Sequence, residues 1–338
     1  MKIEQLTLQN EDACEEFLLN QPAGLIYYSR RFRSFLRELL ACEEKTLLVF
    51  EGGRITGMLP LMSLIGPLGE VINSLPFYGS LGGVLSSTER ASAALLDAYN
   101  ELMQNTHVAS STLISNPLAP ADYSNLEHNL VDKRIGQFTY LMHAEDNPER
   151  LMDGFESSTR RNIRKALNSG ITITTEGSLE FLERVHRDNM AHISGKAKPA
   201  SFFSLIERHF KESEDYQLYT ATKDGAAIAA LLVFYYNKVV EYYIPVIIDD
   251  FRTYQPLALI IYQAMKDAAR KGFTIWNWGG TWLTQEGVYQ FKKKWGTVEK
   301  YYTYFVNIKS ESVRNQNTDY LTNEYPFFYT IPFGELSR

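Results

Sequence analysis

The sequence predicts an α+β protein built from two similar halves. In the second half, three runs rich in β-branched and aromatic residues follow one another, and a helical pattern and a short apolar strand come after them. The first half repeats this order of elements. A length of 338 residues suits two domains of ordinary size. We therefore expect a structural duplication with mixed, largely antiparallel sheets.

The strands of the second half are expected at Gln217–Thr222, Ala226–Tyr236 and Lys238–Ile248. Turns that contain Gly225 and Asn237 separate them. The three strands should therefore form an antiparallel meander.

A helix should follow the meander, because apolar residues recur at helical spacing from Leu257 to Ala268. Pro256 suits the first turn of this helix, and Gly272 suits its end. The apolar run Thr274–Trp278 is the next expected strand.

The first half contains the same series of elements. In chain order they are the strands Lys45–Phe50, Ile55–Ile65 and Val71–Leu75, the helix Ala91–Leu102 and the strand Thr112–Ser115. Little residue identity accompanies the match, so the alternative to a duplication is that both halves share a common α+β pattern.

A linking helix, Ser157–Ser169, should join the halves, with Ser157 or Ser158 as its N-cap and Gly170 at its end. We place the domain boundary before this helix. The expected domains are residues 1–156 and residues 157–338.

Further elements follow the linking helix. Ile171–Thr175 should open the second series of strands, and the helices Leu179–Ile193 and Ser201–Lys211 should flank a loop at Ser194–Pro199. Glycine and lysines in this loop suit either a mobile lid or an ordinary surface connection.

Composition excludes several classes of protein. The net charge of −6 disfavours a broad basic surface for duplex DNA. Cys14 and Cys42 are too few for a disulfide framework or a thiolate metal site, and the scattered histidines suggest no metal. Neither a signal peptide nor a transmembrane run of about 18 apolar residues is evident. We expect a cytoplasmic protein.

Two basic clusters are candidates for binding anions. The first lies on the linking helix and consists of Arg160, Arg161, Arg164 and Lys165, which come one turn apart in pairs. Arginine forks there could clamp phosphate. The alternative is an ordinary solvated helix face.

The second cluster, Gly287–Gly296, places three lysines among large aromatic residues. This pattern favours one lysine held against an apolar wall while its neighbours face water. Just upstream, Trp276–Trp282 contains three tryptophans and a Gly-Gly pair at a strand end, which suits either a site or an aromatic core.

Together these elements resemble the Gcn5-related N-acyltransferase (GNAT) fold. Within it, the chain is most similar to the FemAB/FemX-like family, which adds amino acids to peptidoglycan precursors, and to related acyltransferases of polysaccharide pathways. Three passages carry the resemblance: Ser158–Gly170, Thr253–Leu257 and Tyr289–Gly296, the last with the pattern Tyr-x-Phe-Lys-x-x-x-Gly. The family has two such domains in tandem, so the resemblance implies a tandem duplication of GNAT-like domains.

The resemblance implies transfer of an acyl or aminoacyl group to an amine of a cell-wall or polysaccharide precursor. In this fold the central strands separate, here near Tyr242–Val246, and backbone N–H groups polarise the donor carbonyl. Lys292 would neutralise a phosphate of the acceptor or donor.

Other site residues follow from the same resemblance. Residues expected to contact the substrate are Arg160, Arg161, Arg164, Arg252, Trp278 and Tyr289. Candidates for removing the proton of the acceptor amine are Tyr243, Tyr254 and Asp249.

One stretch departs from the GNAT proteins that use acetyl-CoA. Residues Asp249–Ala258 contain no glycine, Pro256 lacks an N–H, and two aspartates precede it, so pyrophosphate binding at this helix start is disfavoured. The donor stays open between an aminoacyl-tRNA and an acyl-CoA, and no tightly bound cofactor is expected. A coiled-coil arm is not evident.

Two other functions stay open. A non-catalytic protein could bind an anionic glycan or nucleotide sugar, with Trp276–Trp282 as a stacking platform. A single-stranded nucleic-acid binder is disfavoured by the acidic net charge.

Overall fold

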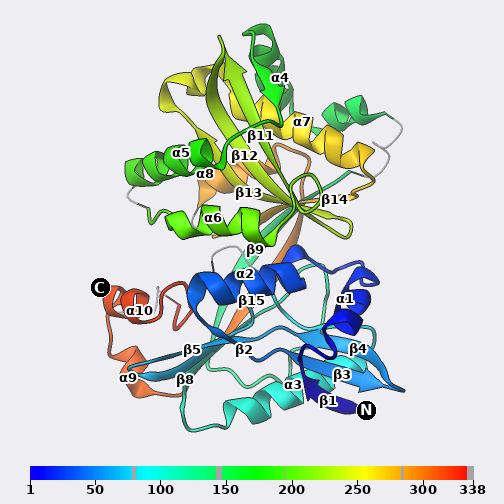
Figure 1. Ribbon diagram of the computed structural model, residues 1–338, viewed down its shortest axis with the longest axis vertical. Coiled ribbons are helices and arrows are strands. Elements are labelled where there is room, and N and C mark those ends of the chain that lie inside the picture. Colours follow the sequence, from blue (N-terminus) through cyan, green and yellow to red (C-terminus); the bar gives the residue numbers. More distant parts are fainter. Residues whose placement is uncertain (78–80, 142–146, 194, 283–284, 333–338) are drawn as a thin grey trace. The chain divides into compact units, whose positions relative to one another are not determined.

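A computed structural model describes residues 1–77, 81–141, 147–193, 195–282 and 285–332. The chain divides into two compact units (Figure 1). The first unit comprises residues 1–134 and 301–338, and the second comprises residues 135–300. The chain passes between the units within β9 (Leu130–Tyr140) and within β15 (Val298–Ile308).

The second unit is built on a sheet with the strand order β10-β11-β12-β13-β14-β9. Its other strands are β10 (Thr172–Thr174), β11 (Tyr216–Lys223), β12 (Ala226–Tyr236), β13 (Val239–Ile247) and β14 (Ile275–Thr281). Strands β10 to β13 pair antiparallel, β13 pairs with β14 in parallel, and β14 pairs antiparallel with β9. The meander expected from the sequence is confirmed.

Helices pack on this sheet. They are η2 (Pro148–Gly154), α4 (Ser157–Asn168), α5 (Leu179–His192), α6 (Ala200–His209), η3 (Asp249–Tyr254), α7 (Pro256–Arg270) and α8 (Glu286–Lys293). One apolar face of the sheet carries Val240 and Trp276, which share a core with α7. On the other face Phe234 of β12 contacts Phe210, just after α6, with ring centroids 4.9 Å apart.

The first unit contains two groups of strands. One sheet has the order β1-β3-β4-β7, and the other strands follow the order β15-β8-β6-β5-β2. Their bounds are β1 (Lys2–Gln5), β2 (Glu43–Glu44), β3 (Leu47–Glu51), β4 (Arg54–Leu59), β5 (Met62–Gly66), β6 (Gly69–Asn73), β7 (Leu85–Ser86) and β8 (Val108–Ile114). The helices are α1 (Glu11–Leu19), η1 (Ile26–Tyr28), α2 (Arg30–Leu40), α3 (Glu89–Met103), α9 (Glu311–Arg314) and α10 (Thr318–Glu324).

The expected duplication is confirmed at the level of topology. In the first unit β5 pairs antiparallel with β6, β6 pairs in parallel with β8, and α3 lies in sequence between β6 and β8. In the second unit β12, β13, α7 and β14 repeat that arrangement. A parallel pair needs a crossover connection, which α3 and α7 supply.

The division of the chain differs from the expected boundary between residues 156 and 157. The segment after β15 returns to the first unit, where α9 and α10, in orange and red, lie with the blue and cyan elements (Figure 1). Lys309 donates to the Met103 carbonyl, and the Asn73 amide donates to the Tyr329 carbonyl at 2.9 Å. The linking helix α4 belongs within the second unit.

Two local expectations were wrong. The run Ile55–Ile65 is two strands rather than one, because Pro60 has no N–H to donate to a ladder and β4 ends before it. The N-cap of α4 is Glu156 instead of Ser157 or Ser158. Gly170 does follow the helix end, with φ of 70°.

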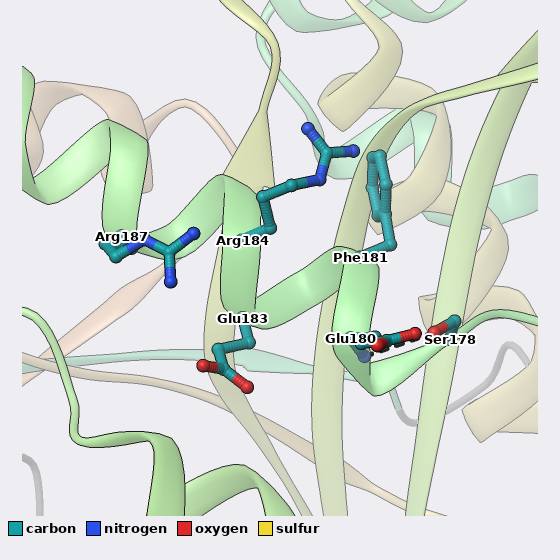
Figure 2. Close-up of a pocket in the computed structure, with 6 residues that line it drawn as sticks. All are labelled: Ser178, Glu180, Phe181, Glu183, Arg184 and Arg187. Carbon is teal, nitrogen blue, oxygen red and sulfur yellow. Dashed lines mark hydrogen bonds between the residues drawn. The ribbon is translucent and has the colours of Figure 1, made fainter.

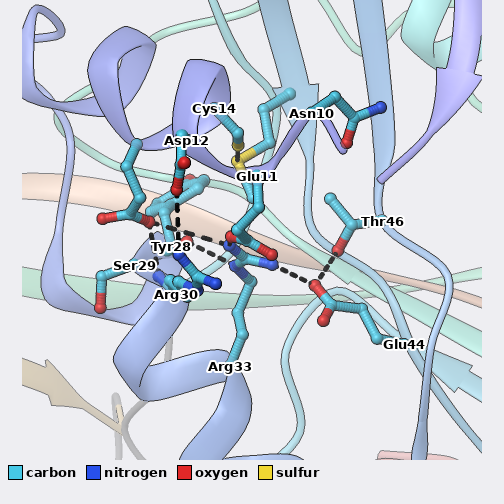
Figure 3. Close-up of polar contacts among 12 residues, drawn as sticks. Asn10, Glu11, Asp12, Cys14, Tyr28, Ser29, Arg30, Arg33, Glu44 and Thr46 are labelled. Atoms are coloured by element: carbon cyan, nitrogen blue, oxygen red, sulfur yellow. Dashed lines mark hydrogen bonds and ion pairs between the residues drawn. The ribbon is translucent and has the colours of Figure 1, made fainter. Parts of the chain in front are cut away.

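A buried cation anchors the first helices of the first unit (Figure 3). Arg33 of α2 is 1% exposed and forms ion pairs with Glu11 of α1 and with Glu44 of β2. Its Nε donates to the Tyr28 carbonyl at 2.7 Å. Burial lowers the pKa of Arg33, but Glu44 and Glu11 outweigh that effect and raise it above its usual value. Arg33 is therefore a structural cation.

Among the described residues, no helix has the length and apolar character needed to span a bilayer.

Candidate active site

Strands β13 and β14 of the second unit part from each other midway along their length. They pair from Val239 and Ile275 to Glu241 and Asn277. Beyond that pair, β13 continues along β12 and β14 continues along β9. A register shift at Tyr243 marks a bulge in β13 at the same point. The separation of strands expected near Tyr242–Val246 is thus confirmed by the pairing.

The last parallel pair puts buried polar groups at this opening. Glu241 is 2% exposed and Asn277 is not exposed. Glu241 lies opposite Phe234, so it shares the face of the sheet that α6 covers. The Asn277 Oδ1 atom accepts the Gly279 N–H at 2.9 Å, whereas its Nδ2 atom has no hydrogen-bond partner among the described residues. Buried donors without partners are uncommon in folded proteins.

Tyr243 lies on the same face beside a lysine. Its ring stacks on Phe202 of α6 at 6.0 Å, and Lys198 Nζ is 5.1 Å from its centroid. The Tyr243 hydroxyl is buried without a hydrogen-bond partner in the described part of the chain. Burial raises the pKa of Tyr243 far above its usual value, and Glu241 adds to the rise. This hydroxyl is a proton donor at neutral pH, so the expected role of Tyr243 as a base is disfavoured.

The surroundings of Lys198 bring its pKa close to neutral pH. Burial lowers its pKa to about 7. The Lys198 backbone N–H donates to His186 Nε2 at 3.1 Å, and burial, together with the Lys198 charge, lowers the pKa of His186 to about 4. His186 is therefore neutral and fixed as an acceptor, and Lys198 can exchange a proton near pH 7. Ser194, at the start of the expected lid loop, lies outside the described residues.

The backbone of β13 offers fewer free N–H groups than expected. The Ile247 N–H donates to Asn189 Oδ1 at 3.1 Å, and Asn189 Nδ2 returns a bond to the Ile247 carbonyl at 2.8 Å. The Ile248 N–H points the other way, to the Ile228 carbonyl of β12 at 2.9 Å. By the two-residue alternation of a strand, residue 245 faces the opening. That residue is Pro245, which has no N–H.

Lys292 of α8 is the buried lysine of its cluster. It is 6% exposed, and its Nζ donates to the Gly280 carbonyl at 3.0 Å and to Thr281 Oγ1 at 2.9 Å. Burial lowers its pKa to about 8. Its neighbours Lys293 and Lys294 are more exposed, so the expected difference in burial is confirmed. Lys292 thereby fixes the end of β14.

The aromatic ring next to Lys292 in the chain is less buried than the lysine itself. Trp295 is buried, but Phe291 is 38% exposed. On the short helix α8, residues 291 and 292 point in different directions, and the buried direction belongs to Lys292.

The loop before α7 is acidic and internally paired. Asp249 of η3 accepts from Arg252 Nε at 2.6 Å, and this bond lowers the pKa of Asp249. Tyr254 is 36% exposed, and Lys223 Nζ lies 5.3 Å from its ring centroid. Arg252 is therefore engaged by a carboxylate, and Asp249 is a weak base at the protein surface. The helix then begins at Pro256.

Other expected substrate contacts are engaged within the fold. Trp278 is 2% exposed, and its indole N–H donates to Thr139 Oγ1 at 2.9 Å. The Tyr289 hydroxyl donates to Glu299 Oε1 at 2.6 Å. Arg160 donates to the Phe155 carbonyl. Trp278 belongs to the aromatic core, which was the alternative interpretation of the tryptophan segment.

Two arginines of α4 remain exposed. Arg161 and Arg164 lie one turn apart on the helix, while Ile163 and Ala166 bury the opposite side against the core. With Lys165, they are the exposed members of the first basic cluster.

Some hollows in the described surface lie away from this opening. One, of about 590 Å³, lies against the outer side of α5 and is lined by Glu180, Glu183, Arg184 and Arg187 (Figure 2). Arg184 packs over the Phe181 ring at 5.4 Å. The charged residues that line this hollow are of both signs and are exposed or half-buried. Among its lining residues there is no buried polar group that would select a ligand. Within the described residues, no group of three histidine, cysteine or acidic side chains is arranged to hold a metal.

Sequence reasoning missed Glu241, Asn277 and Lys198. A signal was present for the first two, since each is a polar residue inside an otherwise apolar strand. Polar residues in buried strands need partners, so such positions are candidates for ligand contacts. Nothing in the sequence indicates that Lys198 is partly buried beside Phe202 and Tyr243.

Comparison with known proteins agrees with this geometry. Residues 155–293 match the family model described as acetyltransferase (GNAT) domain. The solved structure of FemX is similar over 90% of this chain and 97% of its own, with a TM-score of 0.72 and 16% identity. The chain has the FemX-like tandem GNAT fold.

Other structures share the fold at lower similarity. A tandem GNAT protein from the clavulanic acid biosynthesis pathway aligns over 90% of this chain and 97% of its own, with a TM-score of 0.52 and 13% identity. The C-terminal domain of a putative lysylphosphatidylglycerol synthetase from Agrobacterium fabrum aligns over 88% and 91%, with a TM-score of 0.54 and 12% identity. Comparison of the sequence with curated proteins gives no match.

Proposed function

We propose that the second unit of this FemX-like chain is an N-acyltransferase. It would move an acyl or aminoacyl group from a thioester or a tRNA ester to an amine of a cell-wall or polysaccharide precursor. The observation that carries the proposal is the parting of β13 and β14 at Glu241 and Asn277, inside the segment that matches the GNAT domain. The Asn277 amide nitrogen is buried there without an acceptor among the described residues, at a cost in stability that a ligand would offset.

The reaction requires little covalent chemistry from the protein. The amine nitrogen attacks the carbonyl carbon, and the carbonyl electron pair moves onto its oxygen. That pair returns as the bond to the carrier's sulfur or oxygen breaks, and the carrier leaves with the bonding pair. The proton lost by the amine ends on the departing thiol or hydroxyl group. The protein must hold the oxyanion and move that proton.

Proton transfer is assigned to the face that carries Glu241 and Lys198. A group with a pKa near 7 both accepts and returns a proton readily at neutral pH, and burial gives Lys198 this property. Tyr243 beside it keeps its proton and can donate a hydrogen bond. The expected bases Asp249 and Tyr254 remain less suitable proposals, because one is paired with Arg252 and both lie on η3.

A carrier other than CoA is favoured by the charge at the start of α7. Asp249 and Asp250 form the first turn of η3, and Arg252 is bound to Asp249. Pro256 removes an N–H from the helix start. Carboxylates repel a pyrophosphate at the place where helix N–H groups would hold it. We therefore favour an aminoacyl ester of tRNA over an acyl-CoA.

Cationic groups are available for phosphate on either substrate. Lys292 keeps most of its charge at pH 7, since its pKa is about 8, and a phosphate oxygen can replace one of its neutral acceptors. Arg161 and Arg164 present two guanidinium groups on one side of α4. A phosphate-bearing acceptor is therefore proposed.

Mass spectrometry of amino-sugar nucleotides and muropeptides tests the proposal. Cells with the wild-type protein should contain a species heavier by one acyl or aminoacyl group on an amine, and cells without the protein should lack it. Cells that carry only Lys292→Met should show the species strongly reduced. An unchanged profile in all three strains would overturn the enzyme proposal and leave the binding of an anionic glycan or nucleotide sugar as the better account.

A further inference from the structure

The first unit contains a second copy of the strand pair that forms the candidate site. Its parallel strands β6 and β8 pair up to Asn73 and Thr112, as β13 and β14 pair up to Glu241 and Asn277. The two pairs therefore occupy the same position in the duplicated topology.

The side chains of the two pairs also lie on equivalent faces. Ile72, one residue before Asn73, shares a core with Leu95 of α3, so Asn73 lies on the face away from α3. Val240, one residue before Glu241, shares a core with Ile260 of α7. Each unit thus presents its last pair on the face opposite its long crossover helix.

In the first unit the last parallel pair, Asn73 and Thr112, binds a peptide group of the chain itself. Asn73 Nδ2 donates to the Tyr329 carbonyl at 2.9 Å, and Thr112 Oγ1 donates to the same oxygen at 3.3 Å. The Tyr329 N–H donates to Asn73 Oδ1 at 2.7 Å. The end of a parallel pair in this fold is therefore able to bind a carbonyl oxygen through side-chain donors.

In the second unit Glu241 takes the position of Asn73, and Asn277 takes the position of the donor Thr112. The Asn277 donor is oriented but has no acceptor among the described residues. The Gly279 N–H holds Asn277 Oδ1 at 2.9 Å, which fixes the amide so that Nδ2 is the end left to bind. Within the described residues nothing accepts a hydrogen bond from that nitrogen. Gly279 has a φ of 71°, a conformation that glycine adopts without strain.

The β13 backbone beyond the bulge offers no free N–H at positions 245 and 247. Residue 245 faces the opening but is proline, and the next N–H on that side, of Ile247, is bound by Asn189. This leaves the Asn277 side chain as a donor suited to acyl transfer.

We propose that Asn277 Nδ2 donates a hydrogen bond to the carbonyl oxygen of the transferred acyl group. The inference rests on the proposed acyl transfer. As the amine attacks the carbonyl carbon, the electron pair that moves onto the oxygen meets this N–H, and it returns when the bond to the carrier breaks. Asn277 is fully buried in the structure, so the acyl group reaches Nδ2 after side chains on this face rearrange.

Nuclear magnetic resonance of the full chain tests the proposal directly. The side-chain amide of Asn277 is identified as the ¹⁵N signal that Asn277→Asp removes. The protein is then titrated with acetyl-CoA and with 3′-deoxy-3′-(glycylamino)adenosine, each labelled with ¹³C at the carbonyl. We expect one probe to shift both the Asn277 amide and its own carbonyl signal. In Asn277→Asp the probe still binds, but its carbonyl signal stays near the free position.

Kinetics of the same variants give a second readout. Removal of one oxyanion donor lowers kcat by about 100-fold or more, so Asn277→Asp and Asn277→Ala should lose kcat at nearly constant KM. Asn100→Asp is the matched control, because the Asn100 amide also holds a backbone N–H with its oxygen, that of Glu127 at 3.0 Å, but lies in the first unit. Its kcat should be unchanged.

The outcomes separate the two proposals. If a probe shifts other signals of the second unit and leaves the Asn277 amide and the carbonyl unmoved, the role of Asn277 is wrong while acyl transfer stands. Unaltered kcat in folded Asn277→Ala has the same meaning. If neither probe shifts any signal of the second unit, the acyltransferase proposal itself fails.

Discussion

The two units bury their cations in opposite ways. In the first unit Arg33 lies between Glu11 and Glu44, and these carboxylates raise its pKa. In the second unit the buried Nζ of Lys292 donates to carbonyl and hydroxyl oxygens, so burial lowers its pKa to about 8. A cation among carboxylates has one stable state, whereas a cation among neutral dipoles can exchange a proton or a ligand near neutral pH.

The same contrast separates the two strand ends. The first unit closes its last parallel pair with the Tyr329 peptide, whereas Asn277 of the second unit keeps a donor without a partner among the described residues. The two duplicated units thus differ in the group that binds the end of the parallel strand pair. In the first unit this group is a peptide of the chain itself, and we infer that in the second unit it is the substrate.

The largest expected effect is on the stability of the first unit. Arg33→Met removes the cation and leaves Glu11 and Glu44 buried without it. Breaking a buried ion pair in this way costs about 3–5 kcal/mol. Urea denaturation should show a loss of this size. A loss below about 1 kcal/mol, within the range of exposed pairs, would contradict the structural role of Arg33.

Lys292→Met should affect turnover more than the same change at its neighbours. It removes the charge at the end of β14, and loss of one positioned electrostatic contact raises the barrier by about 2–4 kcal/mol. Lys293→Met and Lys294→Met should stay within a few-fold of wild type. Initial rates are compared at a temperature where melting curves show each variant to be folded. Equal losses in all three would indicate a diffuse electrostatic surface instead of one positioned lysine.

The two asparagines should differ in their contribution to stability. Asn73→Ala leaves the Tyr329 N–H without its acceptor and leaves the Tyr329 carbonyl with Thr112 as a donor, at a cost of about 1–3 kcal/mol. Asn277→Ala removes one hydrogen bond, from the Gly279 N–H to Oδ1, together with a donor that has no partner in the described part of the chain, so the free energy of unfolding should change less. Chemical denaturation of both variants measures the difference. Equal losses would show that the Asn277 amide is already satisfied in the folded protein.

A separate expected effect is on the pH dependence of stability. The folded pKa of Lys198, about 7, lies below its ordinary value of about 10.4, so the unfolded chain binds more protons between these values. Stability contributed by this group therefore rises as pH increases from about 7 to about 10.4. Lys198→Met should flatten that rise, and Lys196→Met, at an exposed position, should preserve it. Identical profiles for both variants would contradict the burial of the Lys198 ammonium.

Local patterns predicted the elements better than the site. The meander β11 to β13, helix α7 and the buried state of Lys292 follow from β-branched runs, helical spacing and aromatic neighbours. The hydrogen-bond partners of Lys292 could not be predicted in this way. The sequence does not indicate which oxygen atoms accept hydrogen bonds from a buried ammonium group. Trp278 and Tyr289 show the same limit, because their polar atoms bind Thr139 and Glu299 instead of being free for a substrate.

Contacts between distant parts of the chain could not be predicted from the sequence either. The segment after β15 joins the first unit through Asn73 and Tyr329, which are far apart in the chain. Contacts of this kind depend on tertiary packing, and no local periodicity reports them. The role of Asn277 follows only when this closed strand end is compared with the open one.

The most direct test of the account compares Asn277→Asp with Asn73→Ala in cells that carry only the variant protein. The acyl or aminoacyl mass increment on amino-sugar nucleotides or muropeptides is measured at a temperature where both variants are folded. The account predicts that the increment falls by about 100-fold with Asn277→Asp and persists with Asn73→Ala, since the strand end of the first unit is structural. A full increment with Asn277→Asp, or its loss with folded Asn73→Ala, would contradict the account.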